Sequence, residues 1–88
     1  MDEKSIQELR DCIDLIDEQI ITLINKRMEL SKSIGSLKKE LDLSIIQDDR
    51  WGDVLKNIKH NCKKLNMDYS FIKDIYDIIH KESIKNQK

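Results

Sequence analysis

Five polar side chains occupy positions from which they could together bind an anion that has several oxygens. Arg27 replaces an apolar residue in a long heptad pattern, and Lys38 follows three helical turns later on nearly the same face. Ser83 and Gln87 end a helical stripe that begins with apolar residues, and Arg50 opens a second helix. Arginine and lysine bind carboxylates through charge-assisted hydrogen bonds. The set therefore predicts a polar, cationic pocket.

Each of these residues also has a purely structural interpretation. Arg27 can form an internal ion pair with a carboxylate, because a buried guanidinium without a partner costs several kcal/mol. Lys38 can extend its ammonium group to solvent, and Arg50 can be an exposed first-turn residue. Ser83 and Gln87 can mark the point where their helix leaves the core. The residue types alone leave both interpretations open.

Other kinds of site have little support in the sequence. His60 and His80 are isolated and lack metal-binding spacing. Cys12 and Cys62 lack the CxxC spacing, which favours reduced thiols. The sequence contains no glycine-rich phosphate loop. We therefore expect neither a metal nor a cofactor.

The composition favours one small all-α domain over residues 1–88. The 88 residues include no proline and two glycines, whereas a β-rich fold of this length needs several tight turns. The formal net charge of −1 argues against a dedicated nucleic-acid binder. No apolar run approaches the roughly 20 residues of a membrane span, and the charged N-terminus does not resemble a signal peptide. We therefore expect a cytoplasmic protein without membrane or nucleic-acid partners.

The longest predicted element is an N-terminal helix over about residues 5–40. Its apolar residues repeat with three-and-four spacing through five heptads, interrupted only at Arg27. Ser5 is the candidate N-cap. Gly35 lies inside this helix, where glycine costs about 1 kcal/mol relative to alanine. Close packing against a neighbouring element is the expected reason for that glycine.

Two shorter helices are predicted to follow, over about residues 49–65 and 69–86. Asp48 and Asp49 are suited to the N-cap and first turn of the earlier one. Asp68 is suited to cap the later one. The sequence therefore predicts a chain of three helices.

The length of the first helix predicts an intertwined helical homodimer. About 36 helical residues span roughly 54 Å, whereas a compact chain of this size has a diameter of about 30 Å. The helix is too long to be covered by its own domain. A second copy of the chain is the simplest way to bury the rest of its apolar seam.

The sequence resembles the all-helical chorismate mutases over nearly its whole length, without an insertion. The resemblance starts in the run Leu9-Arg10-x-x-Ile13-Asp14-x-Ile16-Asp17-x-x-Ile20-x-x-Leu23-x-x-x-Arg27-x-x-Leu30. It continues through Ile34-Gly35, Lys38, Asp49-Arg50 and Ser83-x-x-x-Gln87. The resemblance implies an intertwined dimer that converts chorismate to prephenate in aromatic amino-acid biosynthesis. The reaction is a Claisen rearrangement without cofactor or covalent intermediate.

The resemblance also implies a role for each matching residue. Lys38 would contact a substrate carboxylate and the ether oxygen, and Gln87 would donate a hydrogen bond to that oxygen from the other side. The other residues would bind the substrate carboxylates: Arg10 from the partner subunit, Arg27 within its own subunit, and Ser83 and Arg50 as additional contacts.

Two positions depart from the family's pattern, and they keep two other functions open. The family usually has an aspartate and a glutamate where this chain has Gln47 and Trp51. The glutamate accepts a hydrogen bond from the ring hydroxyl of the substrate, which an indole cannot do. One alternative is an isochorismate-pyruvate lyase on the same fold. The other is a non-catalytic helical dimer, in which Arg27 pairs with a protein carboxylate.

Overall fold

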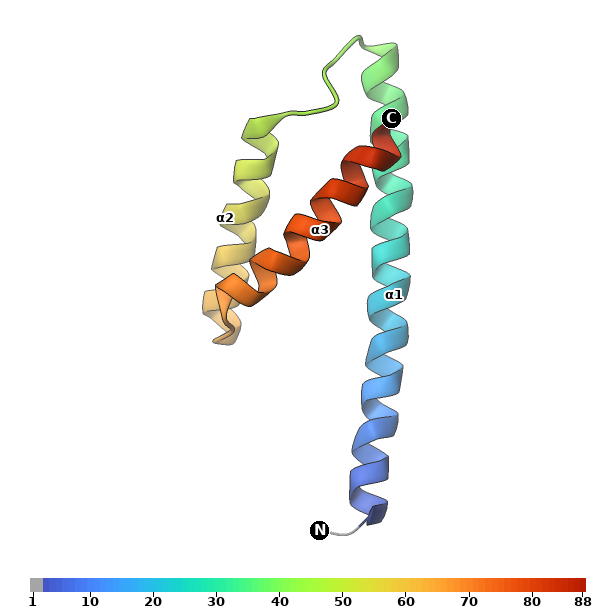
Figure 1. Cartoon of the computed structure of the whole chain (residues 1–88), viewed down its shortest axis with the longest axis vertical. Coiled ribbons are helices and arrows are strands. Elements are labelled where there is room, and N and C mark those ends of the chain that lie inside the picture. Colours follow the sequence, from blue (N-terminus) through green and yellow to red (C-terminus); the bar gives the residue numbers. More distant parts are fainter. Residues whose placement is uncertain (1–2) are drawn as a thin grey trace. The chain divides into compact units, whose positions relative to one another are not determined.

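The computed structural model describes residues 3–88, and all of its regular secondary structure is helical (Figure 1). Helix α1 runs over Glu3–Glu40, α2 over Asp48–Leu65 and α3 over Tyr69–Gln87. The predicted all-α class with three helices is confirmed. Each boundary lies within two residues of the position expected from the sequence.

Helix α1 begins before its predicted cap and ends in a left-handed turn. Its first described residue is Glu3, so Ser5 lies inside the helix and is not the N-cap. At the other end Asp42 adopts φ 56°, and the amide of Leu43 donates to the carbonyl of Lys38 at 2.8 Å. This pattern satisfies a terminal carbonyl without a glycine, because aspartate tolerates the left-handed conformation.

The two shorter helices start in different ways. Gln47 precedes α2 in an extended conformation and provides no side-chain cap, so Asp48 and Asp49 belong to the first turn of that helix. There their negative charges face the positive end of the helix dipole. Asp68 caps α3, and its carboxylate accepts a hydrogen bond from the amide of Ser70 at 3.1 Å. The prediction for Asp68 is confirmed.

The chain divides into two units, a first that ends at Leu30 and a second, Ser31–Lys88, so that α1 contributes to both. In the second unit α2 packs against α3. Ile58 and Cys62 on α2 are the buried apolar side chains of the described residues. Two buried side chains are a small core for a chain of this length.

The apolar seam of α1 is largely exposed on the single chain. The seam residues on α1, together with Leu41 directly after the helix, are between 44% and 66% exposed: Ile6, Leu9, Ile13, Ile16, Ile20, Leu23, Leu30, Ile34, Leu37 and Leu41. A continuous apolar stripe of this kind marks an interaction surface.

None of the helices in the described part of the chain has the length and hydropathy that a membrane crossing requires.

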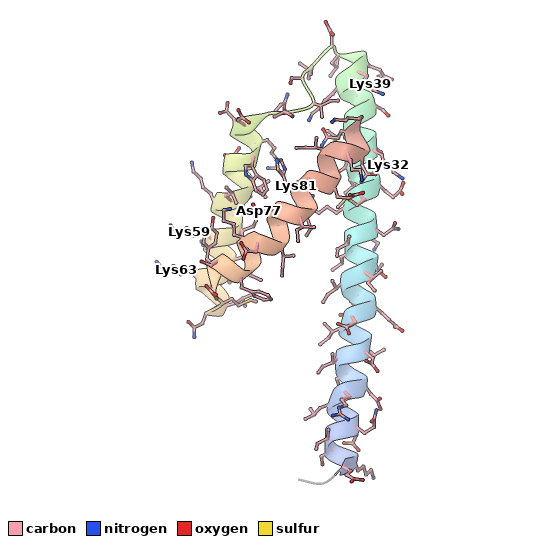
Figure 2. All side chains as sticks on the ribbon, in the orientation of Figure 1. Lys32, Lys39, Lys59, Lys63, Asp77 and Lys81 are labelled. Carbon is pink, nitrogen blue, oxygen red and sulfur yellow. The ribbon has the colours of Figure 1, made fainter. Side chains whose placement is uncertain are left out.

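An ion pair on the surface of α3 joins residues one helical turn apart. Lys73 Nζ lies 3.0 Å from one carboxylate oxygen of Asp77, which is labelled in Figure 2, and 3.2 Å from the other. The hydrogen bond to Asp77 raises the pKa of the Lys73 ammonium. Because the two side chains are 39% and 40% exposed and solvent screens their charges, such a pair adds little to stability.

Candidate functional site

Lys38 and Gln87 meet in the second unit, although they are 49 residues apart in sequence. Lys38 lies in the last turn of α1, and Gln87 is the last residue of α3. The ammonium Nζ of Lys38 donates to Oε1 of Gln87 at 2.5 Å and to the carbonyl oxygen of Ile45 at 2.7 Å. Both side chains are half-buried. The structure thus brings together two of the residues that the sequence predicts to be catalytic.

These hydrogen bonds determine which groups of the pair can act on another molecule. Oε1 of Gln87 already accepts from Lys38, so its Nε2 is the group that can donate. The ammonium of Lys38 has three N–H donors, of which two are used in these bonds. The pair therefore combines a neutral and a charged donor, which suits an oxygen that gains negative charge during a reaction.

Gly35 explains how the end of α3 comes so close to α1. Gly35 is buried, and a methyl group at this position would lie 2.5 Å from Cα of Gln87 and 2.6 Å from its carbonyl oxygen. Real Cβ atoms essentially never approach other heavy atoms this closely. The expectation that Gly35 is required by close packing is confirmed, and the neighbour is the main chain of Gln87.

Ser83 lies one helical turn before Gln87 on α3 and is only 6% exposed. Ser31 has the same exposure and lies one turn before Gly35 on α1. Residues four apart share a helix face, so both serines belong to the faces that carry Gln87 and Gly35. A substrate-binding role for Ser83 stays a prediction.

Arg50 is exposed and lines an open cavity at the start of α2. The cavity has a volume of about 680 Å³, which is sufficient for a small molecule. Its lining consists of Gln47, Asp48, Asp49, Arg50 and Asp53, so one guanidinium faces three carboxylates. This lining alone would repel a dianion, and the predicted carboxylate contact of Arg50 stays a prediction.

Trp51 stacks on His80 of α3, with ring centroids 4.0 Å apart and an angle of 14° between the ring planes. His80 appears isolated in the sequence because its partner is 29 positions away. The only sequence signal was the unusual tryptophan itself. The stack joins the first turn of α2 to α3. It also covers one face of the Trp51 indole, at the position where the resemblance leads us to expect a carboxylate.

Removing the stack should destabilise the protein measurably. His80→Ala loses an aromatic pair worth about 0.5–1.5 kcal/mol. For a chain of this size, each kcal/mol of lost stability lowers Tm by roughly 4–8 °C. Thermal unfolding followed by circular dichroism at equal protein concentrations measures the effect. His60→Ala, at an exposed position on α2, is the matched control and should change stability by less than about 0.5 kcal/mol. Equal effects of the two substitutions would contradict a stabilising role for the stack.

Arg10 and Arg27 lie on the part of α1 that forms the first unit. Arg10 is exposed on the single chain, as a residue that acts in another subunit would be, and Arg27 is half-buried. Their roles in binding carboxylates stay predictions.

The described residues contain no group of three or more side chains suited to hold a metal ion.

Comparison with known proteins gives consistent matches. Residues 9–88 match the family described as chorismate mutase type II. A chorismate mutase from Methanocaldococcus jannaschii is 29% identical over 86 residues, which cover 96% of this chain and 87% of that protein. A bifunctional chorismate mutase/prephenate dehydratase from Aquifex aeolicus is 38% identical over 55 residues, 62% of this chain but 15% of that protein. A solved structure of a conserved hypothetical protein from Pyrococcus furiosus has a TM-score of 0.79 and 32% identity, and the match covers 99% of this chain and 100% of that one.

Proposed function

Because the chain belongs to the chorismate mutase type II family, we propose that it converts chorismate to prephenate, a step in the biosynthesis of aromatic amino acids. The main structural observation that supports this reaction is the contact between Lys38 and Gln87. It supports the proposal because Lys38 and Gln87 are the two residues that the resemblance assigns to the ether oxygen of the substrate.

The rearrangement needs a shaped, polar pocket rather than a nucleophile or a base. Chorismate carries two carboxylates, and the enzyme must hold it in the folded conformer in which the reacting carbons approach each other. As the C–O bond breaks, negative charge develops on the ether oxygen. We assign Lys38 and Gln87 to this oxygen, where each fixed donor contributes about 3 kcal/mol by analogy with oxyanion holes. No covalent intermediate is involved.

The substrate carboxylates require further cations. We assign Arg27 to a carboxylate within its own subunit and Arg10 to the pocket of the partner subunit, with Arg50 and Ser83 as additional contacts. A guanidinium binds a carboxylate through two parallel N–H donors, which fixes orientation as well as charge. Pairing with a substrate dianion would also account for an arginine in the apolar seam of α1.

We propose that the functional unit is a homodimer. The exposed apolar seam of α1 supports this proposal, because a second copy of the chain can cover it. The small core of the single chain supports it as well, since dimerisation adds buried apolar surface.

A charge in the seam should prevent dimer formation. Ile20, 48% exposed on the single chain, would become buried in the dimer, and Ile20→Asp would then bury a carboxylate without a partner. Light scattering after size-exclusion chromatography should give about 21 kDa for the wild type, twice the 10.5 kDa of one chain. The variant should be monomeric or unfolded. The matched control Gln19→Asp places the same charge at an exposed polar position and should stay dimeric. A wild-type chain that remains monomeric would contradict the proposal.

The first experiment is to incubate the purified protein with chorismate and identify the product. Prephenate formed well above the uncatalysed rate would establish the mutase. Trp51 keeps the lyase alternative open, because an indole cannot accept the hydrogen bond that the usual carboxylate takes. Release of pyruvate from isochorismate, with no reaction of chorismate, would favour that lyase. Lack of turnover with either substrate would favour a non-catalytic dimer.

A further inference from the structure

We propose that Gly35 is a positioning residue that sets the contact between Lys38 and Gln87 and thereby controls kcat. The inference rests on the proposed function, because it concerns the pair assigned to the ether oxygen. Gly35 lies three residues before Lys38, on the same face of α1. The main chain of Gln87 packs on the glycine, while its side chain accepts the hydrogen bond from the lysine. Gly35 thus sets the position of the Gln87 backbone, and Lys38 holds the side-chain amide of the same residue.

The backbone conformation does not require glycine at this position. Neither glycine in the described residues has a positive φ, so an alanine could adopt the same dihedral angles. Glycine also weakens a helix interior relative to alanine. Space is the remaining reason for its presence, and the space is taken by backbone atoms of one residue, Gln87.

A methyl group at Gly35 would force a backbone shift. It would lie 2.5, 2.6 and 2.9 Å from Cα, the carbonyl oxygen and the carbonyl carbon of Gln87. Ordinary contacts begin at 3.4 Å. Main-chain atoms cannot rotate away as the end of a flexible side chain can, so α1 and the end of α3 must separate by about 1 Å. A displacement of about 1 Å in a reacting group lowers the rate about a hundredfold.

The test compares the same substitution at both glycines. Gly35→Ala should lower kcat about a hundredfold while KM changes much less, because the displaced residue, Gln87, is assigned to the ether oxygen and not to a substrate carboxylate. Gly52→Ala is the matched control, since nothing lies within 4 Å of a methyl group at that position of α2. It should leave kcat and KM unchanged. Equal kcat values for Gly35→Ala and the wild type would overturn the inference.

A double-mutant cycle separates positioning from general damage. If Gly35 acts through the amide of Gln87, Gly35→Ala should change kcat by less than about twofold in a Gln87→Ala background. A further hundredfold loss in that background would show damage unrelated to Gln87 and would overturn the inference.

A second variant tests the same distance without a clash. Gln87→Asn withdraws the amide by one methylene, leaves the contact with Gly35 unchanged, and should also lower kcat about a hundredfold. Wild-type kcat in this variant would overturn the inference, because the amide position would then be unimportant. The variant keeps the test decisive if Gly35→Ala does not fold.

The side-chain amide resonances of Gln87 report the contact independently of activity. In NMR spectra, Gly35→Ala should shift these resonances and Gly52→Ala should not. If the wild type fails to convert chorismate, the proposed function fails, and this comparison still decides whether Gly35 positions Gln87. Unchanged resonances in Gly35→Ala would overturn the inference whether or not the enzyme is active.

Discussion

Lys38→Met should lower kcat/KM for chorismate by about a thousandfold while the three helices remain folded. Methionine keeps a long unbranched stem and a high helix propensity, but it removes the charge and all three N–H donors. Loss of one preorganised donor to a developing oxyanion costs about a hundredfold to a thousandfold in kcat. Lys38 is also assigned to a substrate carboxylate, so its removal should raise KM as well. Initial rates at several chorismate concentrations separate the two effects.

Lys39→Met is the matched control for this substitution. Lys39, labelled in Figure 2, lies next to Lys38 in the last turn of α1, is exposed, and donates to the carbonyl oxygen of Lys88 at 2.9 Å. It should keep nearly wild-type kinetics. Lys38→Met also loses its hydrogen bonds to Ile45 and Gln87, so its rates should be measured well below its Tm. Activity within tenfold of the wild type would contradict the role assigned to Lys38.

Arg27→Ala should also reduce turnover about a thousandfold, to near the limit of detection, and leave a helical dimer. Removing one partner of a desolvated ion pair costs about 3–5 kcal/mol, because the remaining charge is left without compensation. Here that remaining charge is a carboxylate of the substrate. Arg27→Lys should be intermediate, since it keeps the charge but loses the two-pronged geometry. The measurements are kcat/KM, circular dichroism and molecular mass.

The same variants discriminate between the enzyme and the non-catalytic dimer. If Arg27 were paired only with a protein carboxylate, Arg27→Ala would lower Tm and chorismate turnover would be absent from the wild type as well. Lys26→Ala, at the exposed neighbouring position, provides the baseline for both rate and stability. Near-normal turnover of Arg27→Ala would contradict the pocket proposed around this residue.

The sequence by itself was sufficient for the helices, and its resemblance to the chorismate mutases led to the prediction that Lys38 and Gln87 are catalytic. Apolar spacing, helix-starting aspartates and the lack of proline are local signals, which is why the boundaries of α1, α2 and α3 agree within two residues. Lys38 was recognisable because it follows Arg27 by three helical turns on nearly the same face, and Gln87 because it ends a helical stripe that begins with apolar residues. The intertwined dimer follows from the same pattern and stays a prediction.

The tertiary structure decided which of these residues meet. The contact between Lys38 and Gln87, the approach of Gln87 to Gly35 and the stack of Trp51 on His80 all depend on how distant helices cross. Helical periodicity specifies the face on which a residue lies, but not the point at which another helix crosses that face. These contacts join residues 29 to 52 positions apart, so they depend on how the folded chain packs and not on local sequence.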